Sequence, residues 1–321
     1  MALLEIDDLF TQVPTARGTV RAVDGVSLRI EAGEAVALVG ESGCGKSMTA
    51  LSIMRLLRPP ARTVSGSVRF EGQDLLALTG GEMRRIRGAR IAMVFQDPMT
   101  YLNPLMRVGE QIAESVVLHQ GASAAVARRR AHEALERVRV PSPERMLDQY
   151  PHQLSGGMRQ RVLIAIAVAC RPAVLIADEP TTALDVTIQA QIMRLLAELR
   201  RELGSALVLI THDLGLVAEF CDRVNVMYAG QIVESADASA LFSSPGHPYT
   251  RALLRSILTT ERRSTQFITI DGQPPDLAAP PAGCRFHPRC GQALARCSTD
   301  APGIFASGTG LSRCWLCARS P

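Results

Sequence analysis

The octapeptide at residues 40–47 constrains this chain more than any other segment. Its sequence, GESGCGKS, fits the pattern G-x-x-x-x-G-K-S/T. An apolar run, AVALV, precedes it, and a helical pattern, SMTALSIMRLL, follows it. Glycines in such a turn let several backbone N–H groups point at one anion, and the start of the next helix adds a favourable dipole. The segment therefore predicts a strand, a phosphate-binding loop (P-loop) and a helix in that order.

The loop also carries side chains suited to a nucleoside triphosphate. Lys46 can reach the β- and γ-phosphates, and the Ser47 hydroxyl can bind Mg²⁺. A glycine-rich turn that fits the pattern by chance is the alternative, and the strand-to-helix context argues against it. The residues expected to bind ATP here are Gly40, Glu41, Ser42, Gly43, Cys44, Gly45, Lys46, Ser47 and Met48.

A second apolar run, VLIA at residues 174–177, ends in two acids. In a parallel sheet the carboxyl ends of strands border the ligand crevice. Asp178 is then placed to hold Mg²⁺, and Glu179 to polarise the attacking water as a general base. Two acids after a strand are more often a solvated loop, but the phosphate-binding loop earlier in the chain favours the catalytic interpretation.

Hydrophobic patterning divides the chain into regions. Up to about residue 75 it is β-rich, with strand-like runs at 4–6, 27–30, 35–39 and 67–70, and residues 97–170 look mostly helical. Strands and helices then alternate as far as residue 228, which predicts a parallel sheet with crossover helices. Proline and glycine become frequent after residue 243. We therefore expect one domain at residues 1–240 and an appended segment at 241–321.

Composition narrows the possible partners. The net charge of +4 over 321 residues, without a clustered basic face, argues against nucleic acid. No window of 18 apolar residues is present, so no membrane span is predicted. The first ten residues contain Glu5, Asp7 and Asp8, which a secretory signal would not. We expect a soluble cytosolic chain that contacts a membrane only through a partner.

The segment LSGGM at residues 154–158 resembles the signature motif of ABC ATPases. In register with it, Gln96 resembles the Q-loop glutamine, residues 183–185 (ALD) the D-loop, and His212 the switch histidine. The resemblance covers residues 1 to about 235. It implies an α/β ABC ATPase fold: a RecA-like P-loop core, an antiparallel β subdomain and a helical subdomain, followed here by a small Cys-rich C-terminal extension.

The same resemblance implies a mechanism in which two such domains pair head to tail. Each nucleotide would lie between the P-loop of one domain and the LSGG helix of the other. The catalytic residues would be Glu179, His212 and Gln96, with Gln96 also helping Ser47 and Asp178 to hold Mg²⁺. Arg17 stands where the family usually has an aromatic residue for adenine, and its guanidinium can stack on a base. The residues implied at the paired interface are Ser155, Gly156, Gly157 and Asp185.

Three further segments resemble the ATPases of oligopeptide and dipeptide permeases: QDPMTYLNP at 96–104, HPYTRALL at 247–254 and GCRFHPRC at 283–290. The resemblance implies ATP-driven peptide import at the cytoplasmic face of the cell membrane. The implied partners are a homologous ATP-binding subunit, two transmembrane permease subunits and an extracytoplasmic substrate-binding protein.

Other functions remain open at this point. Similar permeases import nickel or oligosaccharides. A non-transport ABC ATPase of repair or translation is disfavoured because the chain has one ATPase domain and no sustained heptads between Lys46 and Glu179. A non-catalytic nucleotide-binding scaffold is disfavoured because Asp178 and His212 are present as well.

Five of the eight cysteines follow residue 280. In a reducing compartment such a group indicates a metal site rather than disulfides. Four thiolates suit either zinc or an iron–sulfur cluster, and the permease resemblance implies a 4Fe-4S cluster. Its ligands would be Cys284, Cys290, Cys297 and Cys314. Cys317 forms a CxxC pair with Cys314, so the fourth ligand stays open between them, and unligated buried cysteines are the remaining alternative.

Overall fold

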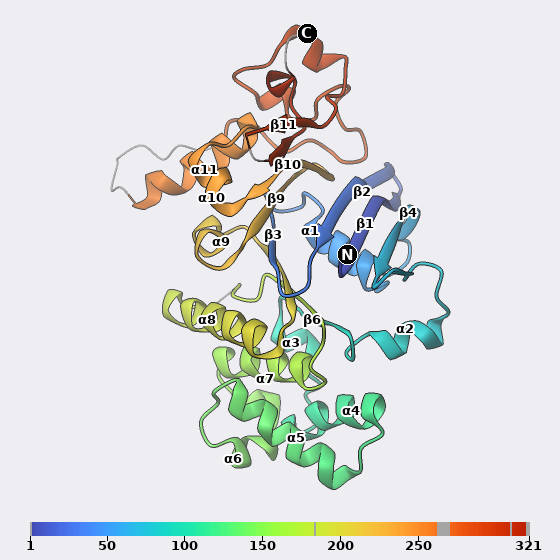
Figure 1. The fold of residues 1–321 in the computed structure, drawn as a ribbon, viewed down its shortest axis with the longest axis vertical. Coiled ribbons are helices and arrows are strands. Elements are labelled where there is room, and N and C mark those ends of the chain that lie inside the picture. The colour runs from blue at the N-terminus through green and yellow to red at the C-terminus, as the bar shows by residue number, and fades with distance from the viewer. Residues whose placement is uncertain (1, 183, 262–269, 309, 319–321) are drawn as a thin grey trace. The chain divides into compact units, whose positions relative to one another are not determined.

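The computed structural model describes residues 2–182, 184–261, 270–308 and 310–318. The chain forms two compact units (Figure 1). Unit 1 comprises Met1–Ile30, Ala35–Leu76 and Ile210–Pro321, and unit 2 comprises Glu31–Glu34 and Ala77–Leu209. The domain division predicted at residue 240 stays a prediction, and that residue lies within the helix α10 (Ala238–Ser243) of unit 1.

Unit 1 begins with an antiparallel sheet in the order β2-β1-β4-β5. Its strands are β1 (Leu4–Thr15), β2 (Gly18–Ile30), β4 (Arg62–Phe70) and β5 (Gln73–Asp74). The register runs from Leu4 opposite Ile30 to Thr15 opposite Gly18. Leu4 and Ile30 are fully buried, whereas the turn at the other end is exposed. Only the apolar ends of β1, β2 and β4 were predicted from sequence, because buried residues such as Leu9 and Val23 alternate irregularly with exposed ones in the rest of β1 and β2, and register shifts interrupt their pairing.

A second set of strands in unit 1 carries the phosphate-binding loop. β3 (Ala35–Val39) pairs in parallel with β9 (Arg223–Tyr228), and β10 (Gln231–Asp237) follows antiparallel to β9. All of β3 is buried, as is typical of a parallel strand covered on both faces. The C-terminal segment adds two short strands at the edge of β10, β12 (Gly310–Ser312) and β11 (Phe305–Ser307) (Figure 1).

The first helix of unit 1 is shorter than the sequence predicts. The helix predicted at residues 47–57 is shorter: α1 runs Lys46–Ile53, and Arg55 with φ 50° takes the left-handed conformation that ends it. The other helices of unit 1 are α9 (Leu214–Phe220), α10, α11 (Pro248–Glu261), η2 (His287–Arg289), η3 (Ala295–Ser298) and η4 (Trp315–Cys317).

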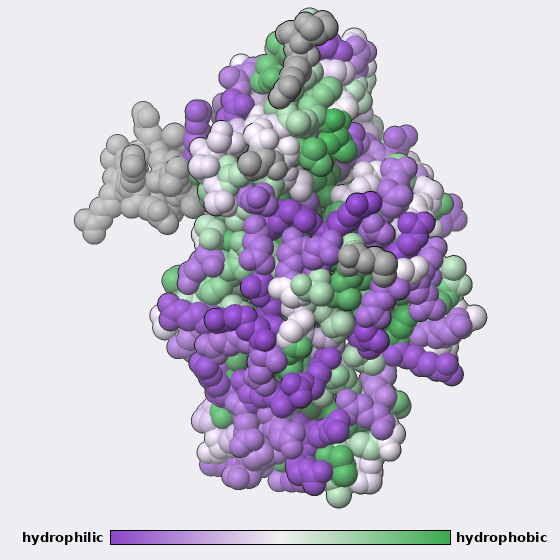
Figure 2. All heavy atoms as spheres, in the orientation of Figure 1, coloured by the Kyte–Doolittle hydropathy of each residue, from purple (hydrophilic) through white to green (hydrophobic). Residues whose placement is uncertain are grey.

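Unit 2 combines parallel strands with helices. β6 (Ile91–Val94) pairs with β7 (Val174–Asp178), and β8 (Ala206–Thr211), whose last two residues belong to unit 1, lies beyond β7. Its helices are α2 (Gly80–Ile86), α3 (Pro98–Tyr101), α4 (Val108–Gln120), α5 (Ala124–Arg137), α6 (Pro143–Leu147), η1 (Pro151–Gln153), α7 (Gly156–Val168) and α8 (Val186–Leu203). The lower part of the face in Figure 2, where α5 and α6 lie, is predominantly hydrophilic. None of the described helices is long and apolar enough to cross a membrane.

Candidate nucleotide site

The phosphate-binding loop follows β3 directly and needs glycine at two positions. Gly40 has φ 155°, and a Cβ there would lie 2.1 Å from the carbonyl oxygen of Met227. Gly45 has φ 110°, and its Cβ would lie 2.1 Å from the carbonyl oxygen of Ala22. Any side chain at either position would collide with backbone of β2 or β9. The loop is therefore held against two strands of unit 1.

Lys46 lies at the first turn of α1 and is 4% exposed. Its Nζ donates hydrogen bonds to the carbonyl oxygens of Gly40 at 2.8 Å and Glu41 at 3.1 Å. The charged amine therefore lies inside the loop. Ser42 and Gly43 are exposed at its tip, Ser47 and Met48 are half-buried, and Cys44 is buried, which raises the pKa of its thiol. The cation predicted from sequence is thus held by carbonyl oxygens of the loop, and its contact with ATP phosphates stays a prediction.

Acidic and amide side chains meet where the parallel strands β6 and β7 of unit 2 end. Asp178 is the last residue of β7 and is 5% exposed. The next residue, Glu179, has φ 45°, and its Oε2 accepts hydrogen bonds from Gln96 Nε2 at 3.1 Å and Thr182 Oγ1 at 2.9 Å. The structure thus brings Gln96 and Glu179 together. Thr182 was missed by the sequence analysis, although a hydroxyl three residues after the acid was the available signal.

The LSGG segment begins helix α7. Ser155 is its N-cap, and its Oγ accepts a hydrogen bond from the backbone N–H of Met158 at 3.4 Å. A Cβ on Gly157 would lie 3.0 Å from Cγ2 of Ile188, so the start of α7 packs closely against the start of α8. Asp185 caps α8, accepting from the N–H of Ile188 at 2.9 Å. Ala183, the first residue of the predicted D-loop, lies outside the described residues.

The last two predicted residues belong to unit 1. His212 is exposed and follows β8, next to Asp213, which caps α9 through bonds from the N–H groups of Gly215 and Leu216. Arg17 is exposed in the turn between β1 and β2. The predicted nucleotide residues are thus divided between the units: Gln96, Ser155, Gly156, Gly157, Asp178, Glu179 and Asp185 are in unit 2, and the others are in unit 1.

Comparison with known proteins places this geometry in a family. The ABC transporter family model matches residues 23–182, and that of the oligopeptide/dipeptide transporter C-terminal region matches residues 233–297. A probable peptide ABC transporter ATP-binding protein of Sinorhizobium fredii is 52% identical over 98% of this chain and 94% of its own length. The chain belongs to the ATP-binding subunits of the oligopeptide/dipeptide ABC transporter family. As a member of that family it is an ATP hydrolase.

Further relatives agree with this membership. The dipeptide transport ATP-binding protein DppD of Escherichia coli is 50% identical over 95% of this chain and 93% of its own. Among solved structures, the ATP-binding cassette MJ0796, determined as a dimer bound to ADP and phosphate, is 31% identical with a TM-score of 0.66, over 73% of this chain and 98% of that one. The predicted ABC ATPase cassette fold, with its mixed α/β sheets, is therefore confirmed.

The cysteines of the C-terminal extension were predicted as a metal site. Among the described residues, no group of three or more His, Cys, Asp or Glu side chains is arranged to hold a metal ion. Nevertheless several of the thiols lie close enough to one another to affect the pKa values of Cys284 and Cys314. Burial raises the pKa of Cys284, and the nearby Cys297 and Cys290 raise it further. Burial also raises the pKa of Cys314 to about 12, with added contributions from Cys317, Cys284 and Cys290.

Cys317 has different polar partners from the other thiols. Its Sγ lies 3.6 Å from Oγ of Ser307 and 3.8 Å from the carbonyl oxygen of Gly246, at hydrogen-bonding distance for sulfur. Cys297 and Cys314 are buried, and the backbone N–H of Cys284 donates to the carbonyl of Cys297 at 2.8 Å. The donor set predicted from the sequence is therefore present as thiols, without the arrangement of a preformed metal site in the described residues.

Proposed function

We propose that this chain hydrolyses ATP to energise an importer of di- or oligopeptides. The main support is sequence identity: this chain is at least 50% identical to peptide and dipeptide transport ATP-binding proteins over 95% or more of its length, including the C-terminal extension. Peptide as cargo rests on the names of these relatives. The roles proposed for Lys46 and Glu179 rest on their contacts, and those of the other residues rest on the resemblance of the motifs.

In unit 1, the P-loop would bind the triphosphate. Its backbone amides and Lys46 meet the β- and γ-phosphates, and phosphate oxygens take the place of the carbonyls that Lys46 now contacts. The hydroxyl of Ser47, the carboxylate of Asp178 and the amide of Gln96 are oxygen donors of the kind Mg²⁺ prefers. Mg²⁺ would neutralise charge on the phosphates when bound. Arg17 would stack on adenine, and His212 would contact the γ-phosphate.

Glu179 would accept a proton from the attacking water. Its Oε2 accepts hydrogen bonds from Gln96 and Thr182, which orient the carboxylate. Because two donors fix the carboxylate, its orientation does not depend on the substrate. The backbone of Glu179 takes the left-handed conformation, so its side chain leaves β7 in a direction that an ordinary strand residue would not give.

We propose that a homologous ATP-binding subunit completes the site. Ser155 and Gly156 are exposed at the start of α7, whose first turn carries no acidic residue. Such a helix end attracts phosphate. In α8, Val186 is 81% exposed beside Asp185, which suits burial against a second chain. The cassette MJ0796 was solved as a dimer, which supports pairing of this chain with a homologous subunit.

The permease subunits would dock beside Gln96. Helix α3 and the loop after it expose three large apolar side chains: Met99 is 59%, Tyr101 42% and Leu105 86% exposed. Exposed apolar side chains this close together are typical of a protein contact. We propose that this surface binds two transmembrane permease subunits at the cytoplasmic face of the membrane, and that an extracytoplasmic binding protein delivers the peptide.

We propose further that Cys284, Cys290, Cys297 and Cys314 hold a 4Fe-4S cluster. Support comes from the closeness of these thiols: Cys297 and Cys290 raise the pKa of Cys284, and Cys284 and Cys290 raise that of Cys314. Cys314 is favoured over Cys317 because it shares those effects with Cys284 and Cys290, while Cys317 lies at hydrogen-bonding distance from Ser307. Such a cluster would order a segment that is rich in proline and glycine.

The proposed function is tested in vesicles that contain the reconstituted permease, its binding protein and both ATPases. Uptake of a labelled dipeptide should require ATP and should stop with Lys46→Ala in this chain, because the loop loses its cation. ATP-dependent uptake that persists at the wild-type rate with Lys46→Ala would contradict the assignment of the loop. Absence of dipeptide uptake alongside nickel or oligosaccharide uptake would contradict the cargo alone.

A further inference from the structure

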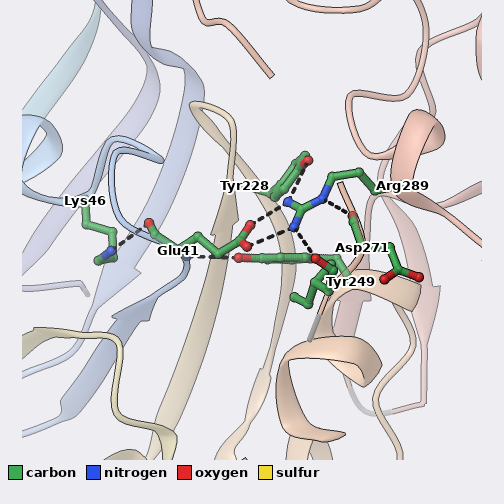
Figure 3. Close-up of polar contacts among 7 residues, drawn as sticks. Glu41, Lys46, Tyr228, Tyr249, Asp271 and Arg289 are labelled. Atoms are coloured by element: carbon green, nitrogen blue, oxygen red, sulfur yellow. Dashed lines mark hydrogen bonds and ion pairs between the residues drawn. The ribbon is translucent and has the colours of Figure 1, made fainter. Parts of the chain in front are cut away.

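The C-terminal extension reaches into the phosphate-binding loop at Glu41. Both Nη atoms of Arg289 donate to the Glu41 carboxylate, at 2.7 Å to Oε2 and 3.0 Å to Oε1. The hydroxyl of Tyr249 in α11 accepts a hydrogen bond from the backbone N–H of Glu41 at 2.9 Å. Figure 3 shows both contacts converging on this loop residue. Two side chains that are remote in sequence therefore hold one residue of the loop.

All the hydrogen-bond donors of the Arg289 side chain have partners, and this side chain is almost fully buried. Its side chain is 4% exposed. Nε donates to the carbonyl of Asp271 at 2.8 Å, and the Nη atoms also donate to the carbonyl of Ile270 at 3.2 Å and the hydroxyl of Tyr228 at 3.3 Å. With the two bonds to Glu41, these make five hydrogen bonds, equal to the number of donors on a guanidinium. The guanidinium is therefore held in one orientation.

An aromatic group supports the contact. The rings of Tyr228 and Tyr249 have centroids 4.6 Å apart, and Phe286 lies 5.2 Å from the first and 5.4 Å from the second. All three residues are at most 3% exposed. Phe286 precedes Arg289 by one turn of the extension. Arg289 therefore extends from a segment that is packed against buried aromatic rings, and not from a solvent-exposed loop.

Glu41 connects this contact to Lys46. Its carbonyl oxygen accepts from Nζ of Lys46, its N–H donates to Tyr249, and its carboxylate binds Arg289. A carboxylate within an anion-binding loop would repel phosphate unless a cation neutralised it. Arg289 is a cation at all physiological pH values, and its bidentate contact supplies both neutralisation and orientation.

We propose that Arg289, with Tyr249, is a positioning residue for the phosphate-binding loop, and that the C-terminal extension thereby sets the affinity of this chain for the phosphates of ATP. The proposal rests on the proposed function of the loop. It makes the extension a part of the nucleotide site, where it acts through Glu41 without touching the nucleotide.

The test measures Mg²⁺–ATP affinity of the full-length chain with a fluorescent ATP analogue, together with thermal unfolding without nucleotide. Arg289→Ala should weaken binding about tenfold or more, the usual size of a coupled charge contact. Arg289→Lys keeps the positive charge but loses the two parallel hydrogen bonds of the guanidinium. Its affinity for ATP should lie between those of the wild type and Arg289→Ala. Adding Glu41→Gln to Arg289→Ala should restore much of the affinity, because the unneutralised charge is gone.

Arg296→Ala is the matched control. It removes another arginine of the extension, one that stacks 3.4 Å from the ring centroid of Trp315, and should leave affinity unchanged. Wild-type affinity in Arg289→Ala would overturn the proposal. So would an Arg289→Ala Glu41→Gln double variant as weak as Arg289→Ala alone, since the arginine would then act only on folding. Normal binding by Lys46→Ala would instead contradict the function proposed for the loop itself.

Discussion

Nε2 of Gln96 lies 3.1 Å from Oε2 of Glu179, and the two residues follow the adjacent parallel strands β6 and β7. Gln96 also precedes the exposed apolar side chains that are proposed to meet the permease. One hydrogen bond therefore links the proposed general base to the proposed docking surface. A permease that displaces Gln96 would change the orientation of Glu179.

Glu179→Gln should slow ATP hydrolysis by about 10²-fold or more, the usual loss on removing a general base. The amide retains an oxygen that accepts from Gln96, so ATP binding should persist. Single-turnover hydrolysis and nucleotide binding measure the two effects. Thr182→Ala is the matched control, with a smaller loss because Gln96 still orients the carboxylate. Hydrolysis by Glu179→Gln at the wild-type rate would assign the base to another residue.

Ser155→Arg should block hydrolysis at the nucleotide bound by the partner's P-loop. The added cation would occupy the exposed start of α7, where the second chain's phosphates are proposed to dock. Site-specific nucleotide trapping in a complex with one variant subunit measures this. Ser155→Ala removes only the helix cap, worth about 1 kcal/mol, and should have a smaller effect. Loss confined to this chain's own P-loop would contradict the head-to-tail pairing.

Protein purified without oxygen should be brown and contain about four irons per chain, as expected for a 4Fe-4S cluster. Serine at Cys284, Cys290, Cys297 or Cys314 should remove the iron. Serine at Cys44, Cys170 or Cys221 provides the control and should not. Stoichiometric zinc without iron would refute the cluster. Loss of iron with Cys317→Ser but not with Cys314→Ser would transfer the fourth ligand.

His247 should make the chain sensitive to acid. Burial, helped by the charge of Arg251, lowers the pKa of His247 to about 4 from 6.5. The unfolded chain therefore binds this proton first as pH falls. The stability that the neutral ring provides is complete above pH 6.5 and is lost as pH falls towards 4, by up to about 3 kcal/mol.

Urea unfolding of wild type and His247→Asn at several pH values measures this dependence. Nδ1 of His247 accepts from the N–H of Tyr249 at 3.0 Å, and an asparagine oxygen can accept the same bond without titrating. The wild type should lose more stability than the variant between pH 6.5 and 4. Equal losses would show that His247 has an ordinary pKa.

Buried parallel strands were predictable from sequence, and exposed pairings were not. The alternation predicted as far as residue 228 ends where β9 ends, and all of β9 except its first residue is buried. In contrast β10, which follows it, was missed because its burial is interrupted and it lies antiparallel to its neighbour. Periodicity reports burial on one face or two. It does not report backbone pairing by polar segments.

The contacts of the candidate site also include one that could be predicted from sequence and one that could not. The meeting of Gln96 and Glu179 follows from parallel strands that end at one edge of a sheet. The contact between Arg289 and Glu41 joins residues 248 positions apart. Polar side chains at such a distance leave no periodic signal, so only the folded chain shows that they are partners.

The buried pair between Arg285 and Asp24 limits how this ATPase can be taken apart. Arg285 also donates to the carbonyl of Ala229, so one arginine of the extension joins β2 to the turn after β9. A chain cut at residue 240 would leave the carboxylates of Asp24 and Glu41 without their cations. Asp24 is buried and Glu41 half-buried, and an unpaired buried charge is strongly destabilising. If a different C-terminal extension were grafted onto this ATPase, Asp24 and Glu41 would therefore have to be replaced together with it.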